Sequence, residues 1–335
     1  MNAIIRTFSV SLFLWVVALV SVFLWGGWSA LFIAILLTIL EVTLSFDNAV
    51  VNAKILQRMS AKWQGYFLTW GILVAVFGTR FVLPILIVAA GVSMSPLDVS
   101  ILVFEDPEEY GHLLEGARTA ISSFGGIFLL MVSLKYFFDD AKEVHWIQTI
   151  EHHVAKWGRI EALEIAIALV LLLAISFILP ASAATILFSG VLGIILFIGI
   201  QGIANAFSVE AKVSSDIAKG SVALFIYLEI LDAAFSLDGV IGAFAITNDL
   251  PVIVVGLGVG AYFVRTLTIY LVRQKTLETL KYLEHGAHWA ILGLAGAMLS
   301  SIFFHVPEII TGSIGLAFVA ASYYSSLKER KILAA

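Results

Sequence analysis

Apolar stretches of about the length of a membrane span follow one another along almost the whole chain. A helix needs about 20 consecutive apolar residues to cross the hydrocarbon core of a bilayer. Such runs lie near residues 8–25, 29–52, 65–91, 119–138, 161–180, 185–204, 220–247, 251–272, 287–304 and 309–326. Continuous apolar runs of this length, without the alternation of strands, favour helices. We therefore predict an all-α polytopic membrane protein with about ten transmembrane helices.

The composition agrees with this class. Of the 335 residues, 61% are hydrophobic and 13% are charged, whereas a soluble domain is about half apolar and a quarter charged. The mean hydropathy is +1.02. The chain has no cysteine, which excludes disulfides and thiolate ligands, so a bound metal ion would need oxygen or imidazole ligands.

The basic residues set the predicted topology. If every run crosses once, all but three of the 19 Lys and Arg residues fall on one face; Arg118 lies on the other, and Arg80 and Arg265 lie within runs. Basic loops stay in the cytoplasm. We therefore predict a multi-pass protein of the bacterial inner (plasma) membrane with both termini in the cytoplasm.

Two segments of the apolar runs are near copies of each other. Leu40–Val50 and Leu231–Ile241 align so that Glu41 falls on Asp232, Ser45 on Ser236 and Asp47 on Asp238. Ionised side chains inside a bilayer are costly and usually functional. A structural role as an arginine partner is the alternative for Asp47 or Asp238 alone, and it explains the duplicated set less well.

The predicted topology makes the two copies inverted relative to each other, since they lie an odd number of crossings apart. We expect a first transmembrane repeat at 1–180, with its motif helix at 29–52, and a second at 181–335, with its motif helix at 220–247. Gly71 precedes Arg80 by nine residues and Gly256 precedes Arg265 by nine, which supports the division. Inverted repeats often form one site at the membrane midplane.

The polar residues of the motif helices suggest a hard cation site. Glu41, Ser45 and Asn48 share one helix face, and so do Glu229, Asp232, Ser236 and Gly239. Asp47 and Asp238 point elsewhere on an unbroken helix. Either they make a different contact, or the helices unwind near Ser45–Asn48 and Ser236–Gly239. Carboxylate, amide and hydroxyl oxygens suit Mg²⁺, Ca²⁺ or Mn²⁺, and Arg80 and Arg265 would balance the carboxylates when no ion is bound.

Histidines provide a second, weaker signal. Glu284, His285 and His288 stand at the start of the ninth run with spacing suited to a metal ligand or proton relay, although solvated side chains are the simpler interpretation. His145, His152 and His153 lie in a charged loop and are predicted to be solvated.

The motif pair resembles a known family. Glu-x-x-x-Ser-x-Asp-Asn at Glu41–Asn48 and Asp-x-x-x-Ser-x-Asp-Gly at Asp232–Gly239 are similar to the signature of the TerC (tellurium resistance) integral membrane proteins of the LysE carrier superfamily. The resemblance runs from about Leu37 to the C-terminus and is closest to a branch long described as of unknown function. It implies manganese efflux or homeostasis, with Glu41, Asp47, Asn48, Asp232 and Asp238 as metal ligands. Asp232 and Gly239 depart from the commoner Glu and Asn.

These observations lead to an expected function. We expect a secondary carrier that exports a divalent cation, Mn²⁺ above others, by alternating access. The alternatives are a proton-coupled carrier of Ca²⁺ or another cation, and a membrane scaffold that recruits stress-response or secretion partners through loop 139–160. No enzyme motif is present. The expected partners are the lipid bilayer and the ion, with a homodimer left open and no nucleic acid; no tightly bound cofactor is expected.

Overall fold

The computed structural model describes residues 3–333 except 93, 141, 161, 215–216, 248 and 275, and these ranges contain helices and no strand. The helices are α1 (Ala3–Leu44), α2 (Phe46–Leu56), α3 (Ala61–Leu68), α4 (Trp70–Leu73), the π-helix η1 (Val74–Val82), α5 (Leu83–Val92), α6 (Pro96–Glu105), α7 (Pro107–Gly116), α8 (Arg118–Phe137), α9 (Gln148–Ala155), α10 (Leu163–Ile178), α11 (Ala183–Ser214), α12 (Ile217–Ile246), α13 (Leu250–Arg273), α14 (Thr276–Thr279), α15 (Leu283–Ser300) and α16 (Glu308–Leu333).

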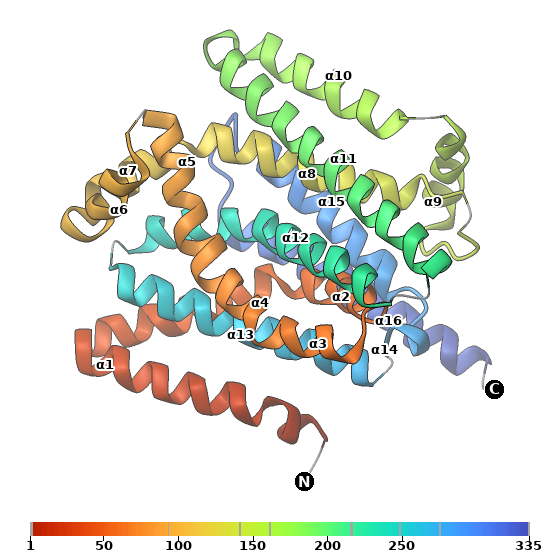
Figure 1. Ribbon diagram of the computed structural model, residues 1–335, viewed down its shortest axis with the longest axis horizontal. Helices are drawn as coiled ribbons and strands as arrows, with labels where there is room; N and C mark the ends of the chain where they lie inside the picture. Colours follow the sequence, from red (N-terminus) through yellow and green to blue (C-terminus); the bar gives the residue numbers. More distant parts are fainter. Residues whose placement is uncertain are drawn as a thin grey trace.

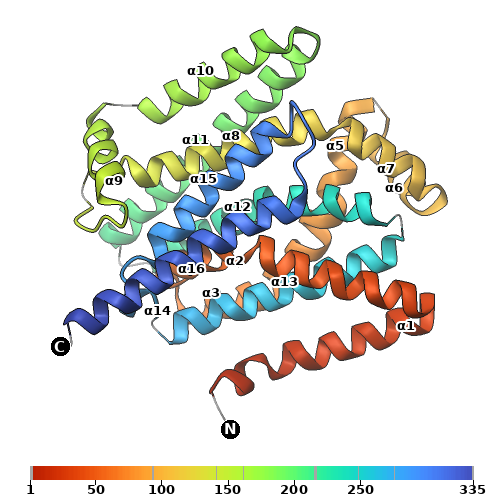
Figure 2. The same ribbon diagram turned by 180° about the vertical axis from the view of Figure 1, so that it is seen from behind.

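The long helices lie side by side along one direction (Figures 1 and 2). Helix α1 packs on α13, α8 packs on α11 and α15, and α15 packs on α16. The C-terminus, α9 and α14 gather at one end of the bundle, whereas α6, α7 and the reversal of α1 lie at the other (Figure 1). We call these the α9 end and the α7 end.

The first two apolar runs form the two legs of α1. Gly27 interrupts this helix with φ 68° and ψ −155°, a conformation that glycine adopts without the penalty a Cβ would bring. The chain therefore folds back on itself there, as Figure 1 shows. Trp25 and Trp28 flank the reversal and are exposed, as is typical of tryptophans at a membrane interface.

The third apolar run is a series of short helices rather than one regular span. Helices α3 and α4 lead into η1, a nine-residue π-helix that carries Arg80. Helices of this kind are rare, and they occur mostly as single turns at functional sites. The π-helix therefore coincides with the part of this run that contains the buried Arg80.

Several helices have the character of membrane spans. Six in the described part of the chain are long and apolar enough by composition: Thr7–Leu44, Ala61–Ala89, Arg118–Phe137, Pro180–Gly202, Leu250–Arg273 and Ile310–Arg330. The pair Gln148–Arg159 and Leu163–Ile178, bent by 103°, would add a seventh. Large apolar side chains point outward, among them Phe13, Phe177 and Phe188. A multi-pass membrane protein follows, whereas ten crossings and inverted repeats stay predictions.

Helix α12 joins two clusters of buried apolar side chains. Leu231, Ala234 and Phe235 belong to a cluster shared with α8, α11 and α15, whereas Val240 and Ile241 belong to one shared with α1, α5, α7 and α13. The helix lies in the middle of the bundle (Figure 1). Polar residues on α12 are therefore surrounded by other helices rather than by lipid.

A buried acidic side chain, that of Glu151, attaches the segment between α8 and α10 to the bundle. Glu151 of α9 accepts hydrogen bonds from the backbone N–H groups of Trp146 (3.0 Å) and Ile147 (3.2 Å), from Trp289 Nε1 (2.8 Å) and from His285 Nδ1 (2.7 Å). Burial raises the pKa of this carboxyl, but the bonds from His285 and Trp289 outweigh it and lower the pKa from 4.5 to about 2. The ionised form of Glu151 therefore stabilises the attachment.

This attachment predicts an acid-sensitive contribution to stability. The native pKa lies below the usual value, so the contribution is complete above about pH 4.5 and is lost as the pH falls toward 2. Glu151→Gln removes the charge and should lower stability by about 1–3 kcal/mol at pH 7. We expect a lower Tm at pH 7, measured by tryptophan fluorescence in detergent, and a smaller loss of Tm between pH 4.5 and 2 than in the parent. Glu143→Gln, at an exposed position of the same segment, is the control; equal pH dependence in the Glu151 variant and the parent would contradict this account.

Candidate functional site

A buried arginine holds two acidic residues of α12. Arg265 of α13 donates from Nη1 to Glu229 Oε1 (3.0 Å) and from Nη2 to Glu229 Oε2 (2.9 Å) and Asp232 Oδ2 (3.0 Å). Its Nη1 also donates to the carbonyl oxygen of Phe67 (3.0 Å), and the Phe67 ring lies 4.2 Å from the guanidinium carbon. A two-pronged contact of this kind fixes both charge and geometry. Helices α3, α12 and α13 therefore meet at one guanidinium.

The equivalent acid of the first motif copy is paired in the same way. Arg80 of η1 forms an ion pair with Glu41 of α1, and both side chains are buried. Ser45 donates to Glu41 Oε1 (3.0 Å), and Arg80 Nη1 donates to the carbonyl oxygen of Ala75 (2.6 Å). Each arginine that the sequence placed within a run thus lies against a motif carboxylate.

One hydrogen bond connects the two motif copies directly. Asn48 of α2 donates from Nδ2 to Asp232 Oδ1 at 2.7 Å, between residues 184 positions apart in the sequence. Both side chains are buried. Asp232 therefore accepts from Arg265 on one oxygen and from the first motif copy on the other.

Glycines allow the helices around these ion pairs to approach closely. A Cβ on Gly260 of α13 would lie 2.6 Å from the Cβ and Cγ of Glu41, and one on Gly71 would lie 2.6 Å from Glu229 Oε1. A Cβ on Gly239 of α12 would lie 3.5 Å from Glu41 Oε2. The Gly239 backbone therefore lies beside the carboxylate of the other copy, where a larger residue would fill the space.

Asp47 makes a different contact from the other motif acids. The Ser45 backbone (φ −101°, ψ 14°) interrupts the helix between α1 and α2, and the Asp47 carboxylate faces Gly315 of α16, whose Cβ would lie 3.8 Å from Asp47 Cγ. Helix α12 runs from Ile217 to Ile246 without a break. Unwinding near Ser236–Gly239 is therefore wrong, whereas the first copy does break at Ser45. The side chain of Asp238 lies outside the described part of the structure.

Among the described side chains of the motif helices, four buried polar atoms have no hydrogen-bond partner. They are Asp47 Oδ1, Asn48 Oδ1, Asn52 Oδ1 and Ser236 Oγ. Buried polar atoms of proteins are nearly always bonded, so oxygens left free on neighbouring motif helices suit a ligand that accepts lone pairs. The sequence prediction missed Asn52, which follows Asn48 by four residues and extends the face of Glu41, Ser45 and Asn48 by a turn.

The carboxylates do not converge on one point. Among the described residues, no group of three or more His, Cys, Asp or Glu side chains has the geometry to hold a metal ion. The ion pairs explain this, because Arg80 and Arg265 occupy the carboxylate oxygens of Glu41, Glu229 and Asp232. The arrangement is charge-compensated by the protein itself.

The acid and histidines at the start of α15 point in different directions. Glu284 pairs with Lys54 of α2 at 2.8 Å, and His285 binds Glu151. His288 donates from Nδ1 to the Glu284 carbonyl oxygen (2.8 Å) and its ring stacks on Tyr136 with centroids 3.5 Å apart. The three do not share a common ligand position in the described structure, and their relay role stays a prediction.

Comparison with known proteins gives a family but no described function. No curated protein and no solved structure matches the chain. A family model described as "Protein of unknown function (DUF475)" matches residues 46–332, which include the second motif copy and the first from Phe46 onward. Because this match spans most of the sequence, the chain belongs to that uncharacterised family, DUF475.

Proposed function

We propose that this protein is a secondary carrier of a divalent cation, with its site between the two motif copies. The observation that carries the proposal is the Asn48–Asp232 hydrogen bond (2.7 Å) between buried side chains of the two copies. Free oxygens of Asn48, Asp47 and Ser236 lie on the same two helices. Oxygen ligands of this kind suit hard divalent ions, and intramembrane carboxylates commonly line ion pathways.

Reciprocal contacts support two related halves. Within each half, a motif acid pairs with the arginine of the helix series that follows it, as Glu41 does with Arg80 and Asp232 with Arg265. Between the halves, Thr38 Oγ1 donates to the carbonyl oxygen of Gly256 (3.1 Å), and Gly71 lies against Glu229. Thr38 aligns with Glu229 in the repeat. Such reciprocity is expected of inverted repeats that form a single site.

The arginines give the carrier a resting state without cargo. An unpaired buried carboxylate is costly, and breaking a buried pair costs about 3–5 kcal/mol. A divalent cation that enters would replace Arg80 and Arg265 as the counter-charge of Glu41 and Asp232. Displacement of the guanidinium groups on η1 and α13 would then move these helices relative to α1 and α12, which is the kind of coupling that alternating access needs.

The identity and direction of the cargo come from the resemblance to the TerC family. That resemblance implies Mn²⁺ and export from the cytoplasm, with Glu41, Asp47, Asn48, Asp232 and Asp238 as ligands. Mn²⁺ accepts the carboxylate, amide and hydroxyl oxygens present here. Coupling to protons fits a site whose carboxylates lie among apolar helices.

The first test removes charge from the site while preserving shape. Glu41→Gln and Asp232→Asn each remove one negative charge, so we expect Mn²⁺ flux into proteoliposomes of the purified protein to fall at least about tenfold, the equivalent of 1.4 kcal/mol. Glu115→Gln, at a half-exposed carboxylate that pairs with Arg118, is the control and should transport like the parent. Parent-like flux in both motif variants, or no flux by the parent, would reject the carrier and favour the scaffold.

A second test adds charge between the motif copies. Asn48→Asp places another carboxylate beside Asp232, where it lacks an arginine, so a bound cation should stabilise this variant more than the parent. We expect a larger rise in Tm on addition of Mn²⁺ than in the parent, measured in detergent. The same amide-to-acid change at the exposed Gln274 should leave the Mn²⁺ effect unchanged. An equal Mn²⁺ shift in Asn48→Asp and the parent would place the ion elsewhere.

The topology can be tested because the chain has no cysteine of its own. If the α9 end is cytoplasmic, a membrane-impermeant maleimide should label Glu109→Cys in intact cells. Lys156→Cys and Arg273→Cys, exposed toward the α9 end, should be labelled only after permeabilisation. Labelling of either of the latter in intact cells would refute the inverted arrangement of the halves.

A further inference from the structure

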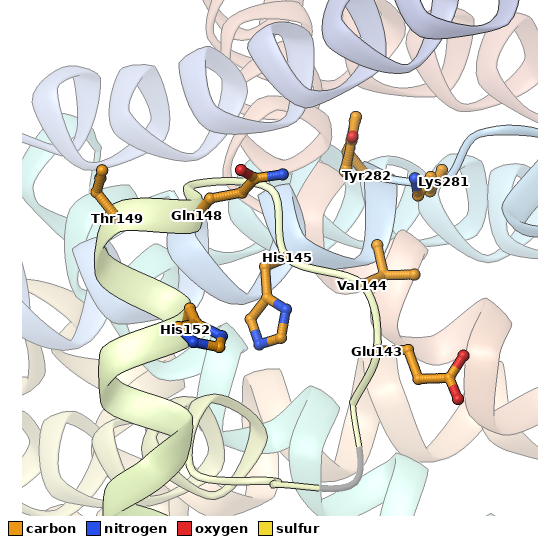
Figure 3. Close-up of a pocket in the computed structure, with 8 residues that line it drawn as sticks. All are labelled: Glu143, Val144, His145, Gln148, Thr149, His152, Lys281 and Tyr282. Atoms are coloured by element: carbon orange, nitrogen blue, oxygen red, sulfur yellow. The ribbon is translucent and has the colours of Figure 1, made fainter. Parts of the chain in front are cut away.

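A pocket of about 430 Å³ lies at the α9 end, away from the motif helices. The segment before α9, the first two turns of α9, and Lys281 and Tyr282 before α15 form its walls. Figure 3 shows the rings of His145 and His152 next to each other in this pocket. The sequence predicted both as solvated loop residues; His152 is exposed and His145 is half-buried, and the structure brings the two rings together.

The two rings have the spacing of two imidazoles that bind the same metal ion. Their centroids are 5.6 Å apart and their planes are inclined by 78°. Imidazole nitrogens lie about 2.0–2.1 Å from a bound zinc ion. Two rings on one tetrahedral ion then have centroids about 5–6 Å apart. His145 and His152 therefore stand at this separation without rearrangement of the backbone.

One ring nitrogen of the pair lacks a hydrogen-bond partner. His145 Nε2 is buried and unbonded, although buried polar atoms normally find a partner. The neighbouring His153 differs, because its Nδ1 is 2.9 Å from the carbonyl oxygen of Thr149. The His153 ring also lies near that of His152, with centroids 6.0 Å apart, so it is the buried, unbonded nitrogen of His145 that distinguishes the pair.

The charges around the pocket set the expected affinity. Lys281 lines the pocket, but its ammonium group is 2.7 Å from Glu329, which compensates the charge. Glu143 also lines it and points away from the two rings (Figure 3). Lys156 lies one turn after His152 and adds positive charge that weakens cation binding. Two imidazoles in this setting form a weak, exchangeable site rather than a permanent one.

We propose that His145 and His152 form a second metal site, for a divalent ion of intermediate softness such as Zn²⁺ or Co²⁺. Imidazole ligands favour these ions over Mn²⁺, which prefers oxygen. In the described part of the chain, no third His, Cys, Asp or Glu side chain joins the pair in metal-binding geometry, so water completes the coordination. The ion would bind the segment before α9 to α9 itself. This site does not depend on the carrier proposal.

The test uses the full chain, purified without a histidine tag, with Zn²⁺ as the probe in isothermal titration calorimetry. His145→Ala and His152→Ala should each weaken binding at least about tenfold, the equivalent of 1.4 kcal/mol. The double variant should lose no more than either single one, because the site needs both rings. His153→Ala is the matched control and should bind like the parent. Tm values, measured in parallel, verify folding.

Two outcomes would overturn the proposal. The first is parent-like Zn²⁺ affinity in the double variant, or an equal loss in His153→Ala, which would indicate unspecific binding to surface imidazoles. The second comes from repeating the titrations in the Glu41→Gln, Asp232→Asn background. Persistence of the histidine-dependent binding there supports a separate site. Its disappearance would mean that the ion binds among the motif helices and that the histidine pair is not a site.

Discussion

The pairing of buried arginines with carboxylates constrains the rest of this structure. In an apolar bundle, an unpaired charge is so unfavourable that its position depends on a partner. Arg265 satisfies two acids of α12 and a backbone carbonyl of α3 at once. Three segments far apart in the sequence are thereby fixed around one planar group. The glycines at 71 and 260 follow from the same constraint, because side chains there would push the helices away from the ion pairs.

The membrane class and the helix positions could be predicted from the sequence because hydropathy reports them directly. In the described part of the chain, each of the ten apolar runs falls largely within helices, and the reversal at Gly27 lies between the first two runs. The short helices α6, α7 and α9 were not predicted, since segments of eight to ten residues are too short to be recognised as membrane spans. The irregular third run was also missed, because the π-helix around Arg80 and the breaks that precede it cannot be distinguished by composition from a regular apolar helix.

The candidate site was predictable in its residues but only partly in its geometry. The duplicated motif identified Glu41 and Asp232, and both lie buried against arginines. The spacing left open whether Asp47 makes a different contact or the helix unwinds, and the structure shows both a contact with α16 and a break at Ser45. Which arginine holds which acid depends on how the helices cross, which is a tertiary property. Asn52 could have been found from its position on the same helix face.

The two polar regions of the bundle are mechanically connected through α2. At its start, Asn48 bonds to α12, and near its end Lys54 pairs with Glu284 at the beginning of α15. The next residue of α15, His285, holds Glu151 and with it the segment before α9. The backbone of α2 thus joins a contact with α12 at its start to a contact with α15 near its end. Because Lys54 is half-exposed, its ion pair is weak and exchanges partners more readily than the buried contacts do.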